Sequence, residues 1–318
     1  MKPPLLAAKL AALVRARWGE APRQPHEVPW GAALVGTDEA WALVEDVRAF
    51  GPALVWAERA GVGRLHVVAD ASAGVLARRA AQFHPAPEVW AVAGTSLVPA
   101  EPEPVPSPAV APGSAEAAGL LVDAGLEVLV EDGIVRGEVN GLEVARVVDG
   151  RLQVGVGQAD RELTALVHGE LDPVDQLDRV VAIARHHRRA DAPPHPLKDL
   201  VPERWLRAQL VAEPSRIGLR ELHPAPTAVP RPNLRDRHVA AARGVDAGGG
   251  EVVVVFSVGV DLDLVPAAAD TRAVLAPGAD LWLVVPARDA HPVTQALVER
   301  LAVPGRVVPV AGDWREAA

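Results

Sequence analysis

The chain has 318 residues, no cysteine and a formal net charge of −9 at pH 7. This length suffices for two or three domains with sizeable cores. The lack of cysteine excludes disulfides and thiolate metal sites, and it favours a reducing, cytoplasmic location. The negative charge argues against general affinity for nucleic acid, and no segment is long and apolar enough to predict a membrane span.

The first 98 residues are expected to form an N-terminal α/β domain. An apolar stripe of Leu6, Leu10 and Leu13 predicts an amphipathic helix near the start. A short strand over 28–35 should follow, and Thr37 is a suitable N-cap for a helical pattern that runs to Ala60. Beyond it, a parallel βαβ unit is predicted from the order strand, helix, strand, over residues 64–69, 73–83 and 88–93.

Residues 99–113 contain six prolines, in PAEPEPVPSPAVAPG. Such a density of proline favours a semi-rigid, extended linker over a core element. A proline-rich ligand segment is the alternative. We therefore expect a domain boundary here, with the next domain over 114–200.

Three turn signals organise that middle domain. Asp132-Gly133, Asn140-Gly141 and Asp149-Gly150 supply the positive φ angles of type I′ turns. They separate four half-polar runs with many β-branched residues, at 126–131, 134–139, 142–148 and 151–156. The pattern predicts a four-stranded antiparallel meander.

The register of this meander places three glutamates in one row. Two-residue turns set Glu127 opposite Glu138, and Glu138 opposite Glu143, all on one face. Like charges directly opposite each other destabilise a sheet, so something must compensate. The simpler interpretation is a solvated face that Arg136, one pleat along, partly neutralises. The alternative is a metal or acid–base cluster.

Helices are expected to follow the meander. One should span 159–168 and end at Gly169, and another should start at Pro173 with Asp172 as N-cap and run to about Arg189. Before the first of them, Gly155-Val156-Gly157 resembles part of a dinucleotide fingerprint, but Asp160 stands where its third glycine is needed.

Residues 201–318 are expected to form a C-terminal α/β domain. A helix over 202–212 precedes an irregular, proline- and arginine-rich stretch over 214–237. A hairpin should turn around 246–250, and the remaining pattern alternates helix and strand, over 264–275, 280–285, 293–301 and 306–310. The predicted fold class is thus α/β, with two βαβ-containing lobes flanking the meander and its helices.

Positive charge is concentrated in one segment. Residues 179–243 carry 13 Lys+Arg and 6 Asp+Glu, or +7, which leaves −16 for the rest of the chain. We expect this segment to pair with acidic parts of the same molecule. Nucleic-acid binding through 179–243 is the alternative, whereas the expected partner is a protein and no membrane partner is expected.

The C-terminal order of helix, hairpin, helix and strand, over about 202–286, resembles the restriction-endonuclease-like PD-(D/E)XK superfamily. That family places an aspartate on one hairpin strand and an acid-x-lysine on the next, to hold a divalent metal. Asp246 matches the first position, but Val255-Phe256-Ser257 lacks the acid and the lysine. Asp261 and Asp263 are possible substitutes, with helix capping as their alternative role.

The meander imitates the same acidic geometry. Glu138 and Glu143 face each other across a turn, but Ala145 stands where the lysine would be. The chain therefore resembles a degenerate nuclease-like scaffold, a pseudoenzyme. We expect a non-catalytic binding or regulatory protein with no cofactor. The alternative is a metal-dependent phosphodiesterase or nuclease, whose divalent metal would take its ligands from Glu127, Glu138, Glu143, Asp246, Asp261 and Asp263.

Overall fold

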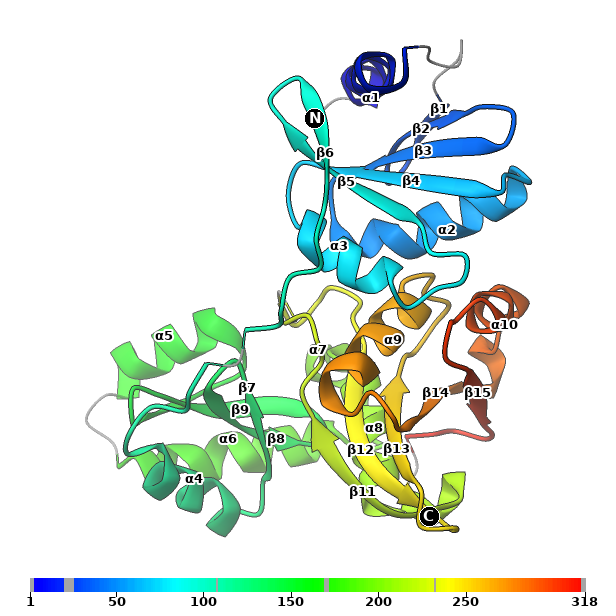
Figure 1. Cartoon of the computed structure of the whole chain (residues 1–318). Coiled ribbons are helices and arrows are strands. Elements are labelled where there is room, and N and C mark those ends of the chain that lie inside the picture. Colours follow the sequence, from blue (N-terminus) through cyan, green and yellow to red (C-terminus); the bar gives the residue numbers. More distant parts are fainter. Residues whose placement is uncertain (1–2, 20–25, 107, 169–171, 232, 316–318) are drawn as a thin grey trace. The chain divides into compact units, whose positions relative to one another are not determined.

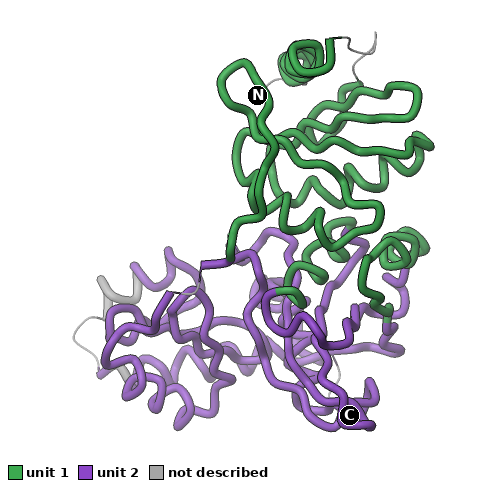
Figure 2. The backbone as a smooth tube through the Cα atoms, in the orientation of Figure 1, with its two compact units in different colours: residues 1–104, 262–273, 291–307 green, residues 105–261, 274–290, 308–318 purple. Residues whose placement is uncertain are grey.

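A computed structural model gives the structure of the chain and describes residues 3–19, 26–106, 108–168, 172–231 and 233–315. Helices and strands alternate in three sheets, which confirms the predicted α/β fold. Two compact units are formed (Figure 2), and neither is continuous in sequence. Unit 1 comprises 1–104, 262–273 and 291–307, and unit 2 comprises 105–261, 274–290 and 308–318.

Unit 1 contains a six-stranded sheet whose strands lie in chain order: β1 (His26–Val28), β2 (Gly31–Val35), β3 (Glu39–Val44), β4 (Arg64–Ala69), β5 (Glu88–Ala93) and β6 (Ser96–Pro99). Strands β3, β4 and β5 are parallel, which confirms the predicted βαβ unit. One face is covered by α1 (Pro3–Trp18), and the other by α2 (Phe50–Arg59) and α3 (Ala73–Ala80) (Figure 1). Leu6, Leu10 and Leu13 of α1 are buried, as their stripe predicts.

Later parts of the chain complete unit 1. They are most of α9 (Leu264–Leu275), the helix α10 (Pro292–Glu299) and the start of β15 (Gly305–Val310). Arg78 of α3 donates to Asp270 of α9 over 2.7 Å, and Arg79 donates to Asp263 over 2.9 Å. Gly51 of α2 lies so close to the backbone of Leu262 that a Cβ there would sit 1.9 Å from its carbonyl oxygen.

The expected helix from Thr37 to Ala60 is wrong in its first half. Residues Glu39–Val44 form β3, antiparallel to β2 and parallel to β4, and α2 begins only at Phe50. Because β3 is buried on both faces, its apolar residues form a continuous run, which does not distinguish a strand from a helix. The single strand expected over 28–35 is instead the β1–β2 hairpin.

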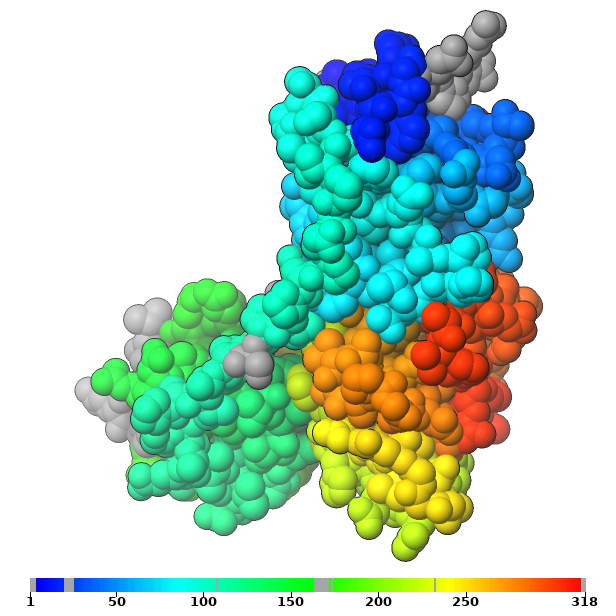
Figure 3. Space-filling view, in the orientation of Figure 1, coloured from blue at the N-terminus to red at the C-terminus, as the bar shows by residue number. Residues whose placement is uncertain are grey.

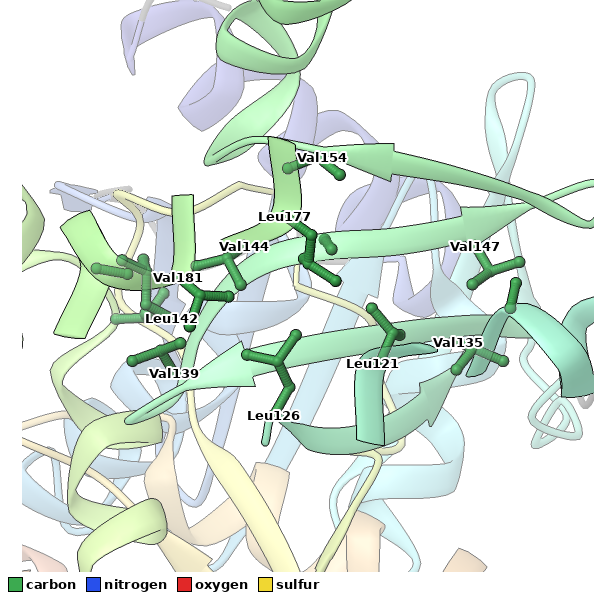
Figure 4. Close-up of a cluster of buried hydrophobic side chains, with 14 residues drawn as sticks. Leu121, Leu126, Val135, Val139, Leu142, Val144, Val147, Val154, Leu177 and Val181 are labelled. Carbon is green, nitrogen blue, oxygen red and sulfur yellow. The ribbon is translucent and has the colours of Figure 1, made fainter. Parts of the chain in front are cut away.

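The meander of unit 2 confirms the expected strands: β7 (Glu127–Glu131), β8 (Ile134–Val139), β9 (Leu142–Val148) and β10 (Arg151–Val154). All six turn residues have positive φ, from 46° at Asn140 to 73° at Gly141, as type I′ turns require. Helices α4 (Ser114–Asp123) and α6 (Pro173–His187) supply Leu121, Leu177 and Val181 to a core on one face of the sheet (Figure 4).

The remaining elements of unit 2 follow the meander. Helix α5 (Gly157–His168) is present, whereas Gly169, its expected end, lies outside the described residues. Asp172 caps α6 through the amide of Val174, as expected. The short α7 (Pro196–Asp199) leads to α8 (Pro202–Ala212), which has the predicted bounds.

A five-stranded sheet follows α8, in the order β11 (Leu219–Ala225), β12 (Ala240–Asp246), β13 (Glu251–Phe256), β14 (Asp280–Pro286) and β15. The β12–β13 hairpin is confirmed, and β13 is parallel to β14. The expectation of an irregular 214–237 is wrong for β11, which pairs with β12 despite a proline in its sequence. Pro224 is tolerated because β11 is the edge strand.

The proline-rich segment has no helix or strand from Glu101 to Pro112 among its described residues. Most of these residues are exposed, and Figure 3 shows them along the surface in cyan to green. The first division between the units falls inside this segment, between Pro104 and Val105.

Candidate functional site

The predicted glutamate row is present, but it does not face water. Glu127 pairs with Glu138, and Glu138 with Glu143, as the turns require. Glu138 is only 1% exposed and Glu143 only 3% exposed, so the expected solvated face is wrong. Carboxylates this deep need charged partners, because burying an unpaired charge is very costly.

Helix α8 supplies two of those partners. Arg204 donates to Glu138 over 2.5 Å and to Glu131 over 2.7 Å. Arg207, one helical turn later, donates to Glu138 and reaches Glu127 over 3.0 Å. Two arginines of the basic segment are thus ion-paired with meander carboxylates, as the intramolecular interpretation of its charge predicts.

Glu143 has three arginine partners of its own. Arg136 lies 2.5 Å from its carboxylate, Arg146 lies 2.6 Å away and Arg161 of α5 lies 3.1 Å away. A β-bulge explains how Arg146 reaches it. Two residue steps from Glu143 to Ala145 oppose one step on β8, so Val144 is the extra residue. Glu143 and Arg146 therefore share a face although they are three residues apart.

Burial and these ion pairs set the acidity of the network. Burial raises the pKa of Glu127, and the nearby Glu138 adds to the rise, although Arg207 opposes both. Burial acts in the same direction on Glu131, but Arg204 and Arg136 outweigh it and hold the pKa of Glu131 below its usual value. Glu127 is therefore the easiest of the two to protonate.

The other metal-ligand candidates have separate surroundings. The carboxylate of Asp246 accepts hydrogen bonds from the amides of Gly248 and Gly250, both over 2.8 Å, within its own hairpin turn. Asp263 is paired with Arg79 in unit 1, whereas Asp261 belongs to unit 2. Within the described residues, no group of three or more His, Cys, Asp or Glu side chains is placed to hold a metal ion.

A pocket of about 1020 Å³ adjoins the Glu143 cluster in unit 2. Strands β7, β8 and β9, the first turn of α5 and one side of α6 contribute to its walls. The stretch from His195 to Leu200, Arg204 of α8 and the described residues of 231–235 complete them. Seven arginines line it, against four carboxylates. The arginines are Arg136, Arg146, Arg161, Arg179, Arg204, Arg231 and Arg235, and the carboxylates are Glu131, Asp132, Glu143 and Asp160.

These arginines differ in how they are held. Arg204 is paired with Glu138 and with Glu131 of the lining, and Arg231 is paired with Glu203. Arg179 and Arg235 are exposed, and neither side chain has a hydrogen bond or ion pair with any described residue. These two guanidinium groups are therefore available to a ligand.

Two buried guanidinium groups of the pocket have a depressed pKa. Burial lowers the pKa of Arg231 to about 10. Burial also lowers the pKa of Arg161, and the positive charges of Arg146 and Arg136 add to the effect. Added negative charge in the pocket would relieve this repulsion.

Comparison with protein-family models, with curated proteins and with solved structures finds no match for this chain. Among the described helices, none has both the length and the apolar character needed to cross a membrane. The chemistry of the site must therefore be argued from its own geometry.

Sequence reasoning found the glutamates and one partner, Arg136, which is paired with Glu143, but it missed the partners on other elements. Arg204 and Arg207 stand three residues apart in a predicted helix, so they share one face of it. That spacing, beside an unneutralised acidic row, is a signal that could have identified them. The pocket gave no comparable signal, because its lining residues come from seven separate stretches of the chain.

Proposed function

We propose that the protein is a non-catalytic binding or regulatory protein, built on a degenerate nuclease-like scaffold, and that it binds an anionic ligand in the arginine-lined pocket of unit 2. The observation that carries this proposal is the pair Arg179 and Arg235, which line a pocket of about 1020 Å³ without partners among the described residues. A pocket of this size suits a small organic molecule.

The arrangement of the glutamates supports a role without metal catalysis. Every carboxylate of the row is bound by at least one arginine, and Glu143 by three. The bulge at Val144 brings a guanidinium, that of Arg146, to the face where a nuclease would use a lysine beside its acid. Arginine has no lone pair to give a metal, and it keeps its charge at neutral pH. The carboxylate oxygens of the row therefore stay paired with guanidinium groups.

The test is binding of simple anions, measured by thermal melts. We expect millimolar pyrophosphate or citrate to raise the melting temperature of the wild-type protein, because a ligand of the native state stabilises it by mass action. The rise should shrink in the double variant Arg179→Gln/Arg235→Gln. It should persist in Arg220→Gln, because Arg220 is exposed on β11 and does not line the pocket.

The same melts address the alternative of a metal-dependent phosphodiesterase or nuclease. A stabilisation by Mg²⁺ or Mn²⁺ that is absent from Glu143→Gln would support the alternative and contradict our proposal. Equal responses of the wild type and the double arginine variant to anions would also contradict it. The expected protein partner stays a prediction.

A further inference from the structure

The pocket lining combines charged and apolar side chains. Arg136, Arg146 and Arg161 surround Glu143. The apolar side chains of the lining are those of Val180, Ile183, Leu197, Leu200 and Leu234, among others. Ile183 is 53% exposed although it projects from α6 beside this cavity. A ligand that contacts both the arginines and the apolar side chains must itself have an anionic group and an apolar body.

The first turn of α5 belongs to the charged part of the lining. Gly157, Gln158 and Ala159 line the pocket, and the N-terminal amides of a helix attract anions. Gly157, the first residue of α5, has φ +78°, a left-handed conformation that glycine adopts at little cost because it has no side chain. The carboxylate of Asp160 already accepts a hydrogen bond from the amide of Val156 over 2.7 Å, so it satisfies one of the donors at this end.

Two buried donors among the lining residues lack acceptors. The Nε–H groups of Arg204 and Arg231 are buried, and neither has a hydrogen-bond partner within the part of the chain that the structure describes. Both residues line the pocket. Leaving a buried donor unsatisfied is unfavourable, so an oxygen-rich ligand group would be favoured beside them.

We propose that the ligand is a phosphate monoester with an apolar or aromatic body, whose phosphate lies between the first turn of α5 and the arginines around Glu143. This inference rests on the proposed anion-binding function. A phosphate is favoured over a carboxylate because it carries a charge of about −1.5 to −2 and three terminal acceptor oxygens. The carboxylate of Glu143 is already shared by three arginines of the lining, so the ligand must compete with one carboxylate there.

The experiment is isothermal titration of the full chain with matched probes. They are 1-naphthyl phosphate, 1-naphthoate, 1-naphthol and inorganic phosphate. We expect 1-naphthyl phosphate to bind at least about tenfold more tightly than each of the other three, because only it combines a doubly charged group for the arginines with a ring for the apolar side chains.

Two variants locate the binding site. Arg161→Gln and Ile183→Ser should each weaken binding of 1-naphthyl phosphate about tenfold, the first through the phosphate and the second through the ring. Arg220→Gln is the control and should bind like the wild type. Circular dichroism of Arg161→Gln checks that the loss is not unfolding. Arg179→Gln, which breaks no contact with a described residue, should also weaken binding of 1-naphthyl phosphate.

The outcomes separate the two proposals. If 1-naphthoate binds as tightly as 1-naphthyl phosphate, anion binding stands and the phosphate inference is wrong. If 1-naphthol binds equally well, or if the pocket variants bind like Arg220→Gln, both proposals are wrong for this pocket. Binding of none of the four probes also contradicts both.

Discussion

At the scale of single residues, the buried charge network is the least expected feature of this protein. Glu138 is bound by both Arg204 and Arg207, which makes it the centre of the row. Removing one partner from a buried ion pair leaves an uncompensated charge, and this costs far more than losing an exposed pair. Substitution of Glu138 therefore measures how much the network contributes to the free energy of unfolding.

We expect Glu138→Gln to lower the free energy of unfolding by about 3–5 kcal/mol, because two buried arginines lose the same anion. The measurement is urea denaturation at pH 7. Glu116→Gln, at an exposed position of α4, is the matched control and should change stability by less than about 0.5 kcal/mol. An unchanged or increased stability of Glu138→Gln would restore the solvated interpretation of the row.

A second buried titratable group lies in unit 1. His66 of β4 is 3% exposed, stacks on Trp41 at 5.5 Å and accepts a hydrogen bond from Trp90 over 3.3 Å. Burial lowers the pKa of His66, although Glu88 and Glu39 act in the opposite direction. The unfolded chain therefore binds a proton more readily than the native protein, and this difference opposes folding at acidic pH.

His66 should accordingly make stability fall as the pH drops below about 6.5, the usual histidine pKa. Its contribution is at most about 1.4 kcal/mol per pH unit. We expect His66→Phe, which keeps an aromatic ring against Trp41, to lose less stability than the wild type between pH 7.5 and pH 5.5. Urea denaturation at both values measures this, with the exposed His223→Gln as control. Parallel losses in His66→Phe and wild type would contradict the assignment.

The register of the row was predictable because Asn-Gly and Asp-Gly turns fix which residues oppose each other. Among the partners, the local Arg136 was predictable, but Arg204 was not, because it is 66 residues from Glu138 in sequence. Local pattern carries no information about which distant helix covers a polar face. The bulge at Val144 also escaped prediction, although Gly137 of β8, where the register shifts, is a signal for it.

At the scale of elements, the turns of the meander have different surroundings despite similar backbone geometry. Gly141 has φ +73° and Gly150 has φ +71°. A Cβ on Gly141 would lie 2.2 Å from the carbonyl carbon of Arg204 in α8, whereas one on Gly150 would lie 3.1 Å from the carbonyl oxygen of Pro112. The second turn is thus a contact point for α8.

We therefore expect Gly141→Ala to be more destabilising than Gly150→Ala. Both substitutions place an alanine in the left-handed region, which destabilises the protein by about 1–2 kcal/mol. Only Gly141→Ala should lose a further 1–3 kcal/mol, roughly the cost of overpacking, because α8 must shift. Denaturation of the two variants side by side gives the difference. Equal losses would show that α8 tolerates the added methyl group.

Elements with a clear hydrophobic periodicity or a clear turn or cap signal were predictable. Elements whose conformation depends on the strands and helices packed against them were not. Helix α8 has the predicted bounds because Pro202 fixes its start. Strand β3 was taken for a helix because burial on both faces removes the alternation that identifies a strand. Strand β11 was missed because its sequence, LRELHPA, alternates poorly and contains a proline.

At the scale of the whole molecule, the sequence gives no sign that unit 1 is discontinuous. The expected C-terminal domain over 201–318 includes 262–273 and 291–307, which belong to unit 1 in the structure. Ion pairs from Arg78 to Asp270 and from Arg79 to Asp263 hold these parts together within the unit. Composition identifies linkers, but it does not show which segments distant in sequence pack into the same unit.

This organisation predicts the behaviour of a nicked chain. We expect cleavage at a protease site inserted after Ala109 to leave the two fragments associated under native conditions, because α9 and α10 remain part of unit 1. Size-exclusion chromatography should show one peak that separates only in denaturant.

Residues 1–104 produced alone should fail to fold, since Arg79, whose side chain is 3% exposed, would lose its partner Asp263. Circular dichroism and thermal melts of that fragment measure this. A cooperative melt of the fragment alone, or separation of the nicked chain without denaturant, would contradict the discontinuous unit.

Discontinuity also has a consequence during synthesis. The last residue of unit 1, Val307, is made 203 residues after Pro104. At about 5–20 residues per second, the first part of unit 1 waits roughly 10–40 seconds for the rest. The meander, whose strands are neighbours in sequence, needs no such delay and is free to form first. A ribosome-bound chain would thus show protected amides in 127–154 while its earlier residues are still exposed to chaperones and proteases.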